Sequence, residues 1–191
     1  MNTTALFVEL LITGIGAGVW FSLTLLCVFG YSWIPFEKII ILPALIPTIA
    51  LLYVLGIIID RISDLAFQGW DKSLRQKHFN KSTDYQRART IVYGQSLSLR
   101  DWFKYGRSRL RICRGWTINS LLCIASLNAF IWIRLPADCP RLHLTLFSSV
   151  MFGLLSIGAL SAWYSLTYRE YQRLREEYSF SQESKQVDSM E

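Results

Sequence analysis

Five basic residues of the chain recur at alternating spacings of four and three, a pattern suited to binding anions. They are Arg100, Lys104, Arg107, Arg111 and Arg114. On an α-helix, which turns by about 100° per residue, these positions fall within an arc of about 80° on one face. Most of them are arginines, whose planar guanidinium groups bind phosphate in bidentate fashion. The stripe is therefore a candidate site for an anionic ligand.

Three kinds of partner fit this stripe. The first is the anionic headgroups of a lipid leaflet, which attract basic residues next to a membrane span. The second is a soluble polyanion such as a nucleotide or a short oligonucleotide, since nearby aromatic rings offer stacking surfaces for bases. These rings belong to Tyr85, Tyr93, Trp102 and Tyr105. The third is a protein partner, and the sequence leaves all three open.

A second constellation lies in the first apolar stretch, from Thr3 to Phe36, where Glu9 is the one charged residue. Its polar side falls on one face of an ideal helix and consists of Glu9, Thr13, Gly16 and Trp20. If several copies assemble around an axis, this face is expected to line a water-filled path with an acidic ring at one end. The alternative is that Glu9 simply lies at the membrane interface.

The opposite side of the same stretch carries a stripe of small residues. It consists of Gly14, Gly18 and Ser22. Small residues four apart let two helix backbones approach closely inside a membrane. We therefore predict that this stripe packs against another helix.

Residues suited to catalysis or to metal binding are sparse. The only two histidines are His78 and His143, and no nucleophile elbow or phosphate-binding glycine loop occurs. Asp60 and Asp64 are the one carboxylate pair placed to act on a lipid headgroup, but the sequence favours a solvated helix face flanked by Arg61 as their explanation. The four cysteines, which show no metal-ligand spacing, are Cys27, Cys113, Cys123 and Cys139. We therefore expect no enzymatic activity, no cofactor and no metal.

Four apolar runs must position these residues. After the first, which contains Glu9, three runs have no charge: Ile39–Ile59, Gly115–Ile133 and Leu142–Tyr168, of 21, 19 and 27 residues. About 20 apolar residues in a helix suffice to cross the hydrocarbon core of a bilayer. The sequence thus predicts an all-α integral membrane protein with four transmembrane helices and the lipid bilayer as its environment.

The charge distribution predicts how these helices are oriented. The chain has a formal net charge of +6, and between Asp60 and Arg114 thirteen Lys and Arg outnumber five Asp, a local net charge of +8. Basic loops stay on the cytoplasmic side of a membrane. We therefore expect this segment to be cytoplasmic, with both termini cytoplasmic as well, and the bacterial inner membrane as the location. The first span lacks a basic start and a small-residue cleavage site, so it is not expected to be a removable signal.

The chain should accordingly divide into four parts. Residues 1–59 hold transmembrane helices 1 and 2, 60–114 the basic cytoplasmic helical segment, 115–168 transmembrane helices 3 and 4, and 169–191 a helix extension with a disordered tail. Within the basic segment we expect a break at 77–82 and a short helix that ends at Gly94. A capping pattern at Ser98 then predicts a helix running into the third span. The disordered tail should begin at Ser179.

These features favour a homo-oligomeric membrane pore, gated through its basic segment by a nucleotide, a short nucleic acid or a lipid headgroup. Small membrane effectors of bacterial nucleotide-signalling defence systems have this general plan, which is an analogy of architecture alone. The alternative is a non-catalytic accessory or scaffold subunit of a larger membrane complex, with a protein partner on the cytoplasmic side. An enzyme that acts on lipid through Asp60 and Asp64 is the third possibility.

Overall fold

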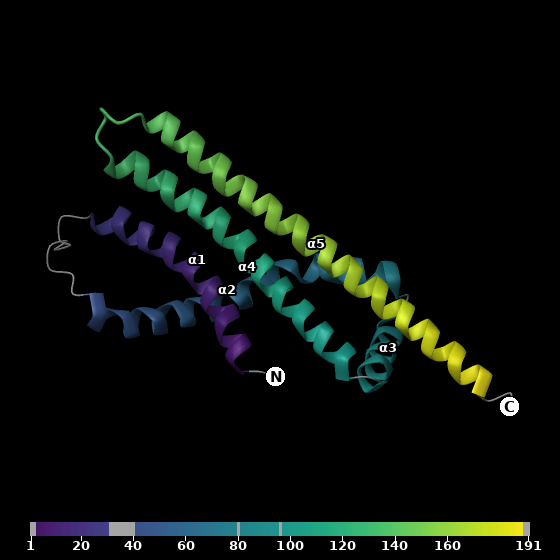
Figure 1. Cartoon of the computed structure of the whole chain (residues 1–191). Coiled ribbons are helices and arrows are strands. Elements are labelled where there is room, and N and C mark those ends of the chain that lie inside the picture. Colours follow the sequence, from purple (N-terminus) through teal and green to yellow (C-terminus); the bar gives the residue numbers. More distant parts are fainter. Residues whose placement is uncertain (1–2, 31–40, 80, 96, 189–191) are drawn as a thin grey trace. The chain divides into compact units, whose positions relative to one another are not determined.

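The computed structural model describes residues 3–30, 41–79, 81–95 and 97–188, which form helices with no strand among them (Figure 1). The helices are α1 (Thr3–Phe29), α2 (Ile41–His78), α3 (Ser82–Gln95), α4 (Leu97–Arg134) and α5 (Arg141–Asp188). Four of them are long and apolar enough to span a membrane, over Leu6–Phe29, Ile46–His78, Tyr105–Arg134 and Arg141–Gln182. The predicted all-α architecture is thereby confirmed, with four helices able to span a membrane.

Contacts divide the chain into two compact units, which we describe separately. The span unit consists of Met1–Asp64 and Arg111–Ser161, and the polar unit consists of Leu65–Leu110 and Ala162–Glu191. Helices α2, α4 and α5 contribute residues to both units. The first and last residues of the basic segment expected over 60–114, namely 60–64 and 111–114, thus belong to the span unit.

In the span unit, α1 and α2 approach each other at two glycines. A Cβ atom built on Gly14 would lie 1.8 Å from the carbonyl oxygen of Leu52, and one built on Gly56 would lie 2.0 Å from that of Leu10. Any larger residue at either position would collide with the backbone of the other helix. The two glycines therefore set how closely these helices pack.

Two features stabilise the C-terminal end of α1. Gly30 has a φ of 76°, a left-handed conformation that favours glycine, and its N–H donates to the carbonyl oxygen of Leu26 at 2.9 Å. From the end of α4, Nε of Arg134 donates to the carbonyl oxygen of Cys27 at 2.7 Å and Nη2 to that of Val28 at 2.5 Å. A cation at a helix C-terminus also complements the helix dipole.

In the polar unit, parts of α2, α4 and α5 pack with α3 around an aromatic core. The rings of Phe67 and Trp163 lie 4.7 Å apart between centroids, and those of Tyr93 and Phe103 lie 5.3 Å apart. Other buried members of the core are Leu74, Phe79, Ala88, Val92, Tyr171 and Leu174. The unit thus has a small hydrophobic core of its own.

The helix ends of the polar unit match some of the local predictions. The break expected at 77–82 falls between α2, which ends at His78, and α3, which begins at Ser82. Helix α3 passes Gly94 by one residue, and α4 begins at Leu97. Helix α5 continues to Asp188, past Ser179, where the disordered tail was expected to begin. No Gly or Pro follows Gly158 in the sequence, so nothing in this stretch interrupts a helix.

Candidate functional site

The polar face of α1 packs against α4 of the same chain. Trp20 Nε1 donates to Oδ1 of Asn119 at 3.1 Å, and Nδ2 of Asn119 donates to the carbonyl oxygen of Thr13 at 2.8 Å. Asn119 is fully buried, and a Cβ atom on Gly16 would lie 2.7 Å from its Nδ2. The face on which we expected a water-filled path is thus covered by α4 within a single chain.

Glu9, on the same face, belongs to a charge network in the span unit. Its carboxylate lies 3.9 Å from Nη1 of Arg111, and Nη2 of Arg114 lies 2.7 Å from Oδ1 of Asp64. Asp60 interacts electrostatically with both arginines. Helices α1, α2 and α4 therefore contribute three acidic and two basic residues to this charge network. Two arginines of the candidate anion-binding stripe therefore face carboxylates of the same chain.

The remaining members of the stripe lie on the polar-unit part of α4. Arg100 and Lys104 are helical, but their side chains lie outside the described residues. The guanidinium carbon of Arg107 lies 5.8 Å from the ring centroid of Tyr93. The structure therefore divides the stripe between the two units and does not present it as one continuous surface.

A second arginine shares the ring of Tyr93. Arg89, one helical turn earlier on α3, places its guanidinium carbon 5.3 Å from the same ring centroid. We call Arg89, Tyr93 and Arg107 the arginine–tyrosine cluster. Stacking on an aromatic ring fixes the plane of a guanidinium group and stabilises its charge. Sequence analysis singled out Tyr93 and Arg107 but missed Arg89, whose spacing of four from Tyr93 on a helix was the available signal.

Two further tyrosines of the polar unit also lie under arginines. Arg75 lies 5.4 Å from the ring centroid of Tyr85, and Arg109 lies 5.6 Å from that of Tyr105. Burial raises the pKa of Tyr85, which lies outside the spans, so its hydroxyl is protonated at neutral pH. Stacking on tyrosine is thus the recurrent environment of arginine in this unit.

The small-residue stripe of α1 has two different environments. A Cβ atom on Gly18 would lie 2.4 Å from a side-chain carbon of Leu52, so Gly14 and Gly18 both face α2. Ser22 is exposed and lies outside this contact. Close packing thus involves the first two members of the stripe.

Catalytic and metal-binding groupings are not apparent in the part of the chain that the structure describes. Within it, no three His, Cys, Asp or Glu residues are grouped so that they could hold a metal ion. Asp64 pairs with Arg114, and Asp60 lies among the same charges. No protein-family model, curated protein or solved structure matches the chain. Function must therefore be inferred from the contacts themselves.

Proposed function

We propose that the chain is a non-catalytic subunit of a larger membrane complex. In this proposal its four spans lie in a bacterial inner membrane, with both termini and the polar unit on the cytoplasmic side. The main support for the proposal is that several polar side chains of the spans form hydrogen bonds within the chain. Besides Asn119, Ser156 donates to the carbonyl oxygen of Thr117 at 3.2 Å, and Ser148 donates to Oδ1 of Asn128 at 2.9 Å.

The outward surface of the span unit supports the same proposal. Helix α4 lies between α1 and α5 (Figure 1), so α5 touches the rest of the unit along one side. Its other sides carry exposed apolar residues, which include Leu146, Phe147, Val150, Leu154 and Ile157. Such faces suit lipid or another apolar helix and are unsuited to a wide water-filled path. An anchor that holds the polar unit near a partner is the role that this surface supports best.

Two measurements on the full chain test this proposal. In planar bilayers the purified chain should give no conductance above that of the empty membrane. Native mass spectrometry of gently solubilised membranes should find it with a different protein in a fixed ratio. A homo-oligomer that conducts ions would contradict the proposal.

A homo-oligomeric pore gated by an anionic ligand, of the defence-effector type, is the second candidate. The observation that favours it is that few polar contacts hold the polar face of α1 against α4. Its contact with α4 depends on the hydrogen bonds of Asn119 and on an ion pair between Glu9 and Arg111 that is wide, at 3.9 Å. Release of α1 would expose a polar face with an acidic residue on it.

The pore candidate makes a distinct prediction about ion flux. Asn119→Ala and Arg111→Gln should both increase flux across liposomes that contain the protein, because each removes a restraint on α1. Glu9→Gln should change the ion selectivity of that flux. Flux that stays at the level of empty liposomes in all three variants would exclude this candidate.

A further inference from the structure

We infer that the arginine–tyrosine cluster is a binding site for a phosphate group. The inference deepens the proposed function and rests on it, because it names the class of ligand that the polar unit recognises. It concerns Arg89 and Arg107, which come from α3 and α4 and meet on the ring of Tyr93. The phosphate would belong either to a lipid headgroup or to a soluble compound.

The positions of both arginines favour the binding of an oxyanion. Two cations that share one ring repel each other, and an anion bound by both removes that repulsion. The guanidinium carbons lie 5.3 and 5.8 Å from the ring centroid, which is the range of a cation–π contact. Within the described residues no carboxylate pairs with either group, so their N–H donors can bind the oxygen atoms of a ligand. The ring of Tyr93 is itself fixed by its contact with the buried side chain of Phe103, at 5.3 Å between centroids. The side chains are therefore ordered before any ligand arrives.

Among the described residues these arginines also have no ion-pair partner. No carboxylate of the described residues lies within 4.0 Å of the guanidinium of Arg89 or of Arg107. One acidic residue, Glu170 on α5, interacts electrostatically with both arginines. Its Oε2 lies 3.8 Å from the position of a Cβ atom built on Gly106, the neighbour of Arg107. One carboxylate thus faces two cations without forming an ion pair, and it would compete with an incoming phosphate.

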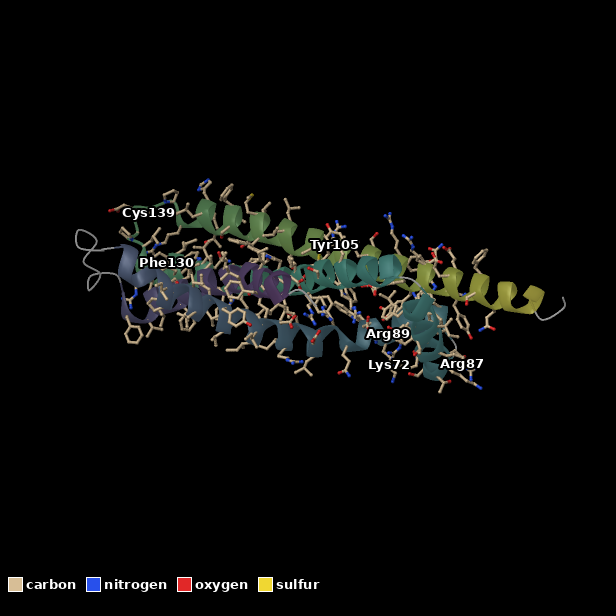
Figure 2. All side chains as sticks on the ribbon, turned by 60° about the horizontal axis from the view of Figure 1, so that its bottom comes forward. Lys72, Arg87, Arg89, Tyr105, Phe130 and Cys139 are labelled. Atoms are coloured by element: carbon tan, nitrogen blue, oxygen red, sulfur yellow. The ribbon has the colours of Figure 1, made fainter. Side chains whose placement is uncertain are left out.

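The polar unit carries further basic residues. Figure 2 labels Arg87 and Arg89 on α3 and Lys72 on α2. Arg87 and Lys72 are exposed, and neither forms an ion pair with another described residue. Long-range attraction toward this basic unit would raise the rate at which an anion reaches Arg89 and Arg107.

The test uses the full chain in nanodiscs of uncharged phosphatidylcholine, with binding measured by calorimetry. Inorganic pyrophosphate is the soluble probe, and the lipid probe is the same nanodisc with phosphatidylglycerol added, followed by native mass spectrometry of retained lipid. The variant Arg89→Gln/Arg107→Gln should bind the preferred probe about tenfold more weakly or worse, because it loses charge-assisted hydrogen bonds. The control Arg169→Gln/Arg175→Gln removes the same two charges from exposed positions on α5 that stack on no ring, and it should bind as the wild type does.

Three more variants distinguish binding at this site from a general effect of charge and from misfolding. Tyr93→Phe keeps the ring and should bind normally, whereas Tyr93→Leu should bind severalfold more weakly although both arginines remain. Glu170→Gln should bind severalfold more tightly because the competing carboxylate is gone. Pyrophosphate binding identifies a soluble phosphate compound as the source, and phosphatidylglycerol retention alone identifies the membrane.

Certain results would overturn the inference. They are binding of neither probe, equal losses in the two double variants, or an unchanged affinity in Glu170→Gln together with Tyr93→Leu. None of these results bears on whether the chain conducts ions or joins another protein. Failure of the phosphate site can therefore be distinguished from failure of the proposed function.

Discussion

Three arginines of the span unit and two of the polar unit have opposite environments. In the span unit Arg114 and Arg111 face carboxylates, and Arg134 donates to the backbone carbonyls of Cys27 and Val28. In the polar unit Arg89 and Arg107 lie at the ring of Tyr93 and form no ion pair with another described residue. The first three arginines connect helices of the chain, whereas Arg89 and Arg107 are the ones that we propose bind a ligand.

Glycines distinguish the contact between α1 and α2 from the rest of the chain. Gly14 and Gly56 lie against backbone atoms of the facing helix, whereas a Cβ atom on Gly69 or Gly94 in the polar unit would meet nothing within 4 Å. The same is true of Gly153 and Gly158 on α5 in the span unit. Close backbone packing is therefore a property of the α1–α2 contact and not of the span unit as a whole.

The largest effect should come from breaking the contact between α1 and α2. Gly14→Ala places a methyl group against the carbonyl of Leu52, where a Cβ atom would lie at 1.8 Å, so the helices must move apart. We expect a loss of about 3 kcal/mol in the free energy of unfolding, measured by titration with denaturing detergent. The matched control is Gly94→Ala, which has open space and removes a flexible residue from α3, so it should stabilise by about 0.5 kcal/mol. Equal effects of the two variants would mean that the glycine contrast is unimportant.

The second largest effect should come from the buried amide between α1 and α4. Asn119→Ala removes the acceptor of Trp20 Nε1 and the donor to the carbonyl oxygen of Thr13, and it leaves the indole N–H without this acceptor. Leaving buried polar groups unpaired should cost about 2 kcal/mol in the same titration. Trp20→Phe, which removes one hydrogen bond and keeps an aromatic side chain, should cost about half as much. If Trp20→Phe costs as much as Asn119→Ala, the packing of the ring and not the hydrogen bond is what matters.

The difference between the units also explains what could be predicted from the sequence. The four spans were predictable because the length of an uncharged apolar run decides whether a helix can cross a bilayer. Periodicity also identified the polar face of α1, but it could not identify what covers that face. Asn119 lies 106 residues from Thr13 in the sequence, and Arg134 lies 107 residues from Cys27. Helical spacing places a residue on a face, and only tertiary packing selects its partner.

The arginine stripe illustrates the same limit within one helix. Its five members do lie on α4, but Arg111 and Arg114 meet acidic residues of α1 and α2, whereas Arg107 meets a tyrosine of α3. Nothing in the spacing of the stripe distinguishes these two environments. Asp60 and Asp64, considered from the sequence as a possible reaction site, turn out to lie beside the arginines.

A smaller effect is expected in the polar unit, at its one buried tyrosine–carboxylate contact among the described residues. The hydroxyl of Tyr171 donates to Oδ1 of Asp71 at 2.9 Å. Tyr171→Phe keeps the ring in the core and removes the donor, so it should destabilise by about 1 kcal/mol. Hydrogen exchange should report this loss in α2 beyond Leu65 and in α5 beyond Ala162, and not in α1. Exchange that rises equally in α1 would mean that the two units do not respond separately.

The smallest effect should come from the ion pair between Asp64 and Arg114, although it is the shortest in the charge network. Asp64 is 41% exposed, so water screens much of the attraction, and the pair should contribute about 0.5 kcal/mol to stability. A double-mutant cycle of Asp64→Asn, Arg114→Gln and the double variant measures this coupling directly. High salt should reduce the coupling, because screening acts on exposed pairs. A coupling of several kcal/mol would instead mean that the charge network is a strong clamp on the spans. In that case ion pairs of Arg111 and Arg114 would contribute substantially to the stability of the packing between the spans.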